Sequence, residues 1–66
     1  MNIAFIKLTS DQEDTTELYV EVSSIKHIGM LVNGVTFVET SAGCSYVKET
    51  PVEVLDKVGK VAEYFD

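Results

Sequence analysis

The stretch Cys44-Ser45-Tyr46-Val47-Lys48-Glu49-Thr50-Pro51-Val52-Glu53 decides the fold, because it predicts a short strand that runs directly into a helix. Thr50 can serve as the N-cap, and Pro51 suits the first helical position, where its missing N–H would have no partner. Glu53 is placed so that its carboxylate reaches back to the cap N–H, which completes a capping box. The sequence therefore predicts a helix that begins at Pro51.

The residues after Pro51 predict an amphipathic helix with one core-facing side. The expected core face comprises Val54, Leu55, Val58, Val61, Ala62 and Phe65. On this assignment, Leu55→Ala should lower stability by about 2–5 kcal/mol. The expected solvent face comprises Asp56, Lys57, Lys60 and Glu63. Gly59 is expected to be an exposed, tolerated glycine, with a close approach of another backbone as the alternative.

Five segments before this helix carry the alternating pattern of β-strands, and we predict strands at residues 3–8, 18–22, 26–32, 35–40 and 44–48. Residues 3–8 are apolar on both faces, which is typical of a central strand. In the second segment Leu18, Val20 and Val22 alternate with outward-facing residues, so we expect them to face the core.

The connections between these segments carry distinct turn signals. Residues 9–17, TSDQEDTTE, are polar and acidic with no hydrophobic period, and we expect a long hairpin loop. Ser23-Ser24 breaks the second strand, and a helical turn or bulge there would place Ile25 in the core. Asn33-Gly34 predicts a two-residue type I′ hairpin, because both residues tolerate positive φ. Gly43 is the expected positive-φ residue of the next turn.

The fold predicted from these elements is α+β: a five-stranded antiparallel meander, curled or forming a partly open barrel, with one C-terminal helix on a face. Short connections favour the strand order 1-2-3-4-5. The 66 residues form one small domain, 1–66. A domain of this size buries only about 60 per cent of its unfolded surface. Since Cys44 is the only cysteine, no internal disulfide can form, and we expect a homo-oligomer to supply the missing stability.

The charge and hydropathy of the chain exclude several partner classes. Eleven acidic against five basic residues give a net charge of −6, which disfavours nucleic acid and anionic membrane surfaces. The apolar runs are too short to span a membrane, and the stretch Met1-Asn2-Ile3 lacks the basic residues of a signal peptide. A lone thiol suits a reducing compartment, so we expect a cytoplasmic protein.

Residues for catalysis or cofactor binding do not form a recognisable pattern, and we expect no catalytic residue, no cofactor and no enzyme activity. His27 and Cys44 lie on different predicted strands, so an exposed histidine and a buried or edge cysteine are the favoured interpretation. A cation site at Asp11, Glu13 and Asp14 is the alternative to a solvated loop. Calcium loops also need a turn glycine and a distal glutamate, so we expect no metal.

The run Met30-Leu31-Val32 adds more apolar surface than one small core can absorb, which favours an interface. We name Met30, Leu31 and Val32 as candidate protein-interface residues, with Tyr19 and Tyr64 as amphipathic anchors of the kind that interfaces favour. Membership of the core is the competing interpretation for each of them.

Three segments of the chain carry a resemblance to a known family: FIKLT at residues 5–9, LYVEVSSIKHI at residues 18–28, and YVKETPVEVL at residues 46–55. They resemble the FlbD-like family of small flagellar and swarming-motility proteins. The family begins with an IKLT-type strand and ends in a similar strand-to-helix junction. Its Pro-Asp-Thr before the middle strand is replaced here by residues 29–34, GMLVNG, and the first hairpin is longer and more acidic. The resemblance implies a non-catalytic cytoplasmic protein that binds another protein and supports motility.

Two hypotheses follow. The first is a small non-enzymatic protein-interaction module, self-associating and protein-binding, with a motility role implied by the resemblance. The second is an acidic regulator, of the kind that phages and mobile elements carry, which occupies a basic, nucleic-acid-binding surface of another protein. Its motivation is the −6 charge with Asp11, Glu13, Asp14 and Glu17 close in sequence. A catalytic or ligand-binding domain would require a pocket formed between subunits.

Overall fold

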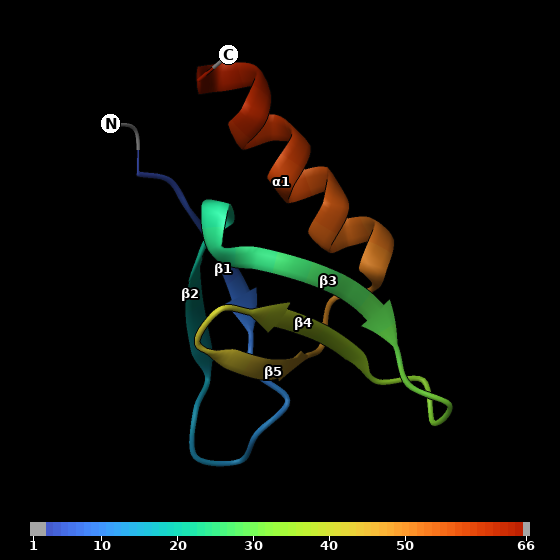
Figure 1. The fold of residues 1–66 in the computed structure, drawn as a ribbon. Coiled ribbons are helices and arrows are strands. Elements are labelled where there is room, and N and C mark those ends of the chain that lie inside the picture. Colours follow the sequence, from blue (N-terminus) through green and yellow to red (C-terminus); the bar gives the residue numbers. More distant parts are fainter. Residues whose placement is uncertain (1–2, 66) are drawn as a thin grey trace.

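In the part of the chain that the computed structural model describes, residues 3–65 with side chains through residue 61, five strands precede a C-terminal helix (Figure 1). The elements in chain order are β1 (Phe5–Thr9), β2 (Glu17–Glu21), the 3₁₀ turn η1 (Val22–Ser24), β3 (Ile25–Met30), β4 (Thr36–Thr40), β5 (Gly43–Val47) and α1 (Pro51–Phe65). The predicted α+β class and the helix that begins at Pro51 are confirmed.

The strands form two antiparallel sheets, so the predicted single meander is not confirmed. β1 pairs with β2, and the second sheet has the order β3-β4-β5. Between them η1 turns the chain: Ser23 Oγ donates to Glu21 Oε1 at 2.6 Å, and Ser24 Oγ donates to the Glu21 carbonyl at 2.8 Å. These local bonds compete with a strand ladder. An isolated bridge from Ser10 to Val47 links the end of β1 to β5, and the sheet does not close into a barrel.

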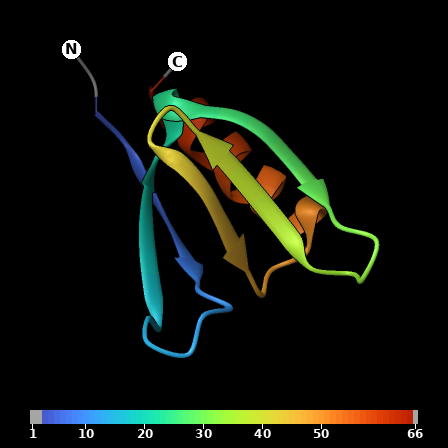
Figure 2. The ribbon, with the colours of Figure 1, turned by 60° about the horizontal axis from the view of Figure 1, so that its bottom comes forward.

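One hydrophobic core lies between the two sheets and α1, which runs across a face of the three-stranded sheet (Figure 2). Its buried members are Ile6, Leu8, Val20, Val38, Val47 and Val54. Half-buried side chains packed against it are Leu18, Val22, Ile25, Ile28, Val58 and Val61. The inward alternation of the second strand and the placing of Ile25 against the core after the Ser-Ser break are therefore confirmed.

Two burial predictions are wrong. Ile3 and Phe5 are 58% and 54% exposed, so the outer face of β1 is open and this strand is not buried on both sides. Leu55 is 56% exposed, whereas Val54 is fully buried. Successive helical residues turn by about 100°, so a helix that points Val54 and Val58 at the core leaves Leu55 on its flank. The side chains of Ala62 and Phe65 lie outside the described residues.

The turn after β3 also differs from the prediction. Gly34 has φ +90°, but no described residue other than glycine has positive φ, so Asn33-Gly34 does not form a type I′ turn. The Leu31 N–H donates to the Val35 carbonyl at 2.8 Å, and the Gly34 N–H donates to the Leu31 carbonyl at 2.9 Å. This is a three-residue loop with glycine at its bulge position. Gly43 has φ +138°, which confirms the second turn glycine.

Reciprocal hydrogen bonds confirm the predicted capping box at the start of α1. The Thr50 N–H donates to Glu53 Oε1 at 2.9 Å, and the Glu53 N–H donates to Thr50 Oγ1 at 3.1 Å. The helix therefore begins at a defined position directly after β5. Because the first residue of α1 is fixed, the residues between β5 and α1 are also held at a defined position against β1.

Charged side chains hold the strand-to-helix junction against β1. The Thr9 N–H donates to both carboxylate oxygens of Glu49, at 2.9 and 3.0 Å, and Thr9 Oγ1 donates to Glu49 Oε2 at 2.9 Å. Lys57 Nζ donates to the Lys7 carbonyl at 2.9 Å. Partial burial acts to raise the pKa of Glu49, but the hydrogen bonds from Thr9 and the nearby Lys57 charge outweigh it and lower that pKa.

Candidate interaction surfaces

Exposed apolar side chains occur where β3 ends and where α1 begins. We call the set formed by Met30, Leu31, Val32, Val52 and Leu55 the apolar end. Met30 is 55% exposed and Val32 is fully exposed, so the run that the sequence marked as surplus does not belong to the core. Figures 1 and 2 both show the first turn of α1 beside the end of β3. The first turn of α1 and the end of β3 therefore lie close together at one end of the molecule.

Leu55 joins this surface because of its position around the helix. Val54 points at the core, and Lys57, about 60° to one side of it, reaches β1. Leu55 is about 100° to the other side, on the flank turned away from β1. The prediction that Leu55 belongs to the core face is wrong, because Val54, Val58 and Val61 form that face.

The predicted interface residues are not all brought together. Tyr19 is 62% exposed on β2, and its hydroxyl donates to Glu17 Oε2 at 3.2 Å. β2 and the loop that carries Leu31 and Val32 lie on opposite sides of the molecule in both views. The side chain of Tyr64 lies outside the described residues. Tyr19 therefore belongs to a surface separate from the apolar end.

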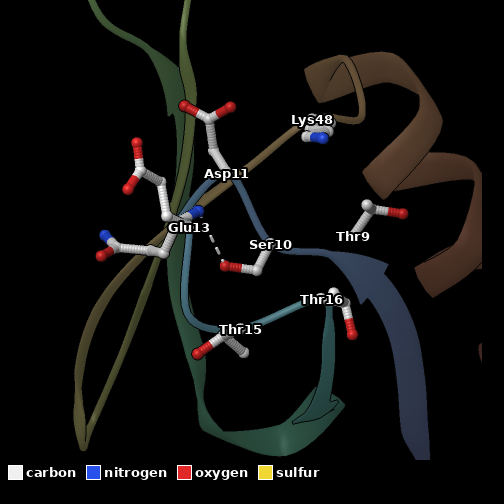
Figure 3. A pocket seen from close by; sticks show the side chains of 8 residues that line it. Thr9, Ser10, Asp11, Glu13, Thr15, Thr16 and Lys48 are labelled. Atoms are coloured by element: carbon white, nitrogen blue, oxygen red, sulfur yellow. Dashed lines mark hydrogen bonds between the residues drawn. The ribbon is translucent and has the colours of Figure 1, made fainter.

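The acidic loop after β1 borders a depression of about 360 Å³ (Figure 3). Its base is anchored, because the Asp11 N–H donates to the Tyr46 carbonyl at 2.9 Å and the buried Ser10 Oγ accepts from the Gln12 N–H at 3.0 Å. Figure 3 shows the carboxylates of Asp11 and Glu13 pointing outward, away from the Ser10 hydroxyl. The loop therefore presents its negative charge to solvent.

The sheet register brings together three chemically active side chains that the sequence left apart. His27 stands opposite Glu39, and Glu39 stands opposite Cys44, in a row across β3, β4 and β5. His27 Nδ1 lies 2.7 Å from Glu39 Oε1, and all three residues are exposed. Since Glu39 separates the imidazole from the thiol, the row lacks the adjacent base that a nucleophilic cysteine requires. The sequence alone does not give this row of side chains, because the row depends on the register between the strands.

Among the described residues, no group of three or more His, Cys, Asp or Glu side chains is arranged to hold a metal ion. None of the helices in residues 3–65 is long and apolar enough to cross a membrane.

Comparison of the chain with protein-family models, with curated proteins and with solved structures found no match.

Proposed function

We propose that this chain is a small, non-enzymatic, cytoplasmic protein-interaction module that associates with copies of itself through the apolar end. The observation that carries the proposal is the exposure of Met30, Leu31 and Val32, which a single core does not use. Each molecule carries a net charge of −6, so two copies repel one another over most of their surface. The five residues of the apolar end carry no charge, so contacts between them add no repulsion of their own.

The energetics favour a two-fold arrangement. Full burial of a valine, leucine or methionine side chain is worth about 1.5–3 kcal/mol, and the exposed fractions here allow a large part of that gain. Loss of rigid-body freedom on association costs about 4–15 kcal/mol, which no single side chain offsets. In a two-fold interface every contact occurs twice, so the five residues of the apolar end supply ten contributions.

Sedimentation and light scattering across a concentration series test self-association. We expect dimers or larger species for the native protein and monomers for Val32→Asp, because the substitution places a carboxylate in the contact. Ile3→Asp is the matched control: Ile3 is 58% exposed outside the apolar end, and the added charge is the same. A native protein that stays monomeric at every concentration, or equal effects of the two variants, would sink the proposal.

The resemblance of residues 5–9, 18–28 and 46–55 to the FlbD-like family supports a role as a motility accessory, in which the module also binds another protein. Crosslinking of the tagged protein in its native cells, followed by mass spectrometry, addresses this role. Recovery of flagellar motor or export proteins would support it. Recovery of the chain's own subunits alone would argue for a self-assembling module without a motility role.

The outward carboxylates of Asp11 and Glu13 favour a second candidate function, an acidic regulator that occupies a basic surface of a nucleic-acid-binding protein. Such a regulator would displace DNA from its partner, and salt would strongly weaken the effect. If the double variant Asp11→Asn/Glu13→Gln displaces DNA from the partner as well as the native protein does, that result would count against this candidate.

A further inference from the structure

The hydrogen-bond pattern of the β1–β2 hairpin leaves one edge of β2 without a strand partner. The Val22 N–H donates to the Ala4 carbonyl at 2.9 Å, and the Ser10 N–H donates to the Thr16 carbonyl at 3.2 Å. Even-numbered positions therefore form the hydrogen-bonded pairs of this antiparallel ladder. Positions 17, 19 and 21 turn their backbone groups toward the other edge. Within the described chain, the sheet order places no strand there.

The backbone groups at this free edge are suited to pairing with an added strand. Tyr19 presents both its N–H and its carbonyl, and Glu21 presents its N–H. The Glu21 carbonyl is already occupied by Ser24 Oγ at 2.8 Å, so the available edge ends there. An added antiparallel strand would exchange two backbone hydrogen bonds with Tyr19.

The second edge of β1, by contrast, is closed by specific contacts. On β1, Glu49 accepts from the Thr9 N–H and Lys57 donates to the Lys7 carbonyl. The Lys48 N–H, directly after β5, donates to the Thr9 carbonyl at 2.9 Å. α1 packs beside β3. Proteins commonly block exposed edges in this way, because an open edge recruits further strands. No such contact covers positions 19 and 21 of β2 within the described residues.

A groove of about 400 Å³ runs along the free edge. One wall consists of four consecutive β2 residues, 18–21, and the other of residues 40–42 with Ser45. Because alternate strand residues face opposite sides, four in a row line a groove only along the backbone edge. Figures 1 and 2 show the β4–β5 turn beside the end of β2, where the Ser41 N–H donates to the Ser24 carbonyl at 3.1 Å. This bond closes one end of the groove.

The charges beside the groove select the kind of strand that fits. Glu17 and Glu21 flank Tyr19 on the same outer face of β2. Glu17 lies 3.3 Å from Lys7 Nζ, and the hydrogen bond with Lys7, followed by that from Tyr19, lowers its pKa. Glu21 accepts from Ser23 Oγ and has no cationic partner among the described residues. Both carboxylates therefore favour positive charge on an added strand.

The same charges argue against a second copy of this chain as the occupant. Two β2 strands paired antiparallel about Tyr19 would place Glu17 of each copy opposite Glu21 of the other, and like charges directly opposite destabilise a ladder. A partner strand with Lys or Arg at those two positions would instead form opposite-charge pairs. The −6 charge of the molecule also attracts a basic segment over longer range.

We propose that the free edge of β2 binds an extended basic segment of a partner protein, which adds to the β1–β2 sheet as an antiparallel strand. The segment carries an apolar residue opposite Tyr19 and a Lys or Arg two positions to either side of it. The exposed ring of Tyr19 provides apolar contact for the central residue, and Phe5 on β1 also lines the groove. This surface is distinct from the apolar end and does not depend on self-association.

Amide hydrogen exchange measured by NMR on the native protein tests the pairing directly. The probe is a blocked peptide with a central valine, lysine two positions to either side, and threonine elsewhere; the control peptide carries glutamate in place of both lysines. We expect the lysine peptide to slow exchange at Tyr19 and Glu21 and to leave the already bonded Leu18 and Val20 amides unchanged. Unchanged exchange at positions 19 and 21 with saturating peptide, or equal binding of the glutamate peptide, would overturn the proposal.

Substitutions at Glu21 separate backbone pairing from charge. Glu21 has φ −70°, which matches the angle that proline requires, so Glu21→Pro removes one edge N–H at little conformational cost. Glu21→Ala removes the same carboxylate and keeps the N–H. We expect Glu21→Ala to weaken peptide binding about threefold and Glu21→Pro to weaken it about fivefold further. Equal affinities of the two folded variants would show that the edge N–H is not used and would refute strand addition.

Discussion

Replacing Glu49 with glutamine should lower the free energy of unfolding by about 1.5 kcal/mol at neutral pH. The Glu49 carboxylate accepts three hydrogen bonds from Thr9, from its N–H twice and from Oγ1 once. Hydrogen bonds to a charged group contribute about 1.5–3 kcal/mol net, and the partial exposure of Glu49 places the effect at the lower end. For a domain of this size, that loss lowers Tm by about 6–12 °C.

The effect should depend on pH in a defined direction. The pKa of Glu49 in the folded protein is lowered from its ordinary value of 4.5, so folding favours the ionised carboxylate. Its contribution is fully present above the unfolded pKa and is lost as the pH falls through the folded pKa. The stability difference between the native protein and Glu49→Gln should therefore be constant from neutral pH down to about pH 5 and shrink below pH 4.5.

Urea unfolding followed by circular dichroism between pH 3 and 7 provides the measurement. Glu13→Gln is the matched control, because Glu13 is an exposed loop carboxylate and the change in net charge is identical. We expect the control to change stability by less than about 0.5 kcal/mol at every pH. If the two variants behave alike, or if the loss in Glu49→Gln persists undiminished at pH 3, the junction is not held by this carboxylate.

Three further comparisons test the packing, the cap and the turns by thermal or urea unfolding. Val54→Ala should lower the free energy of unfolding by about 2–3 kcal/mol, because the Val54 side chain is fully buried, whereas Leu55→Ala should lower it by less than about 1 kcal/mol. A larger effect for Leu55→Ala than for Val54→Ala would restore the core face of the helix that the sequence predicts. Thr50→Ala should cost about 1 kcal/mol through loss of the cap, and an unchanged melt would contradict that role. Gly59→Ala should stabilise the helix by about 0.5–1 kcal/mol, because open space surrounds the position. Gly43→Ala should lower the free energy of unfolding by about 1–3 kcal/mol, because Gly43 has φ +138°. Equal effects of Gly59→Ala and Gly43→Ala would contradict the positive φ of Gly43.

Local signals in the sequence were sufficient for the elements and insufficient for their pairing. The capping box at Thr50 and Glu53 involves only neighbouring residues, and the structure confirms it in detail. The separation of the two sheets depends on Ser23 and Ser24, whose hydroxyls bond to Glu21 and turn the chain. A serine pair is compatible with a bulge that preserves pairing as well as with a turn that ends it. The sequence pattern therefore could not decide between one meander and two sheets.

The candidate surfaces were harder to predict than the elements, because the exposure of a side chain depends on which other elements pack against its strand. The alternation of β1 places Ile3 and Phe5 on one face, but only the arrangement of the elements shows that nothing described covers that face. The prediction that Met30, Leu31 and Val32 exceed what the core can absorb is confirmed, because Met30 ends β3, the other two follow it, and all three are exposed. Their role as an interface remains a prediction for the self-association experiments.

Charged residues show most clearly why the free edge of β2 could not be found from the sequence. Lys57 was assigned to the solvent face of α1, yet its side chain reaches the Lys7 carbonyl and closes the edge of β1. Glu17 and Glu21 are equally charged, but they stand on the outer face of β2, from which they leave the Tyr19 N–H and carbonyl accessible. The same residue types therefore block one edge and flank the other. Side-chain direction relative to the ladder makes the difference, and it follows from the hydrogen-bond register that begins with Val22 and Ala4.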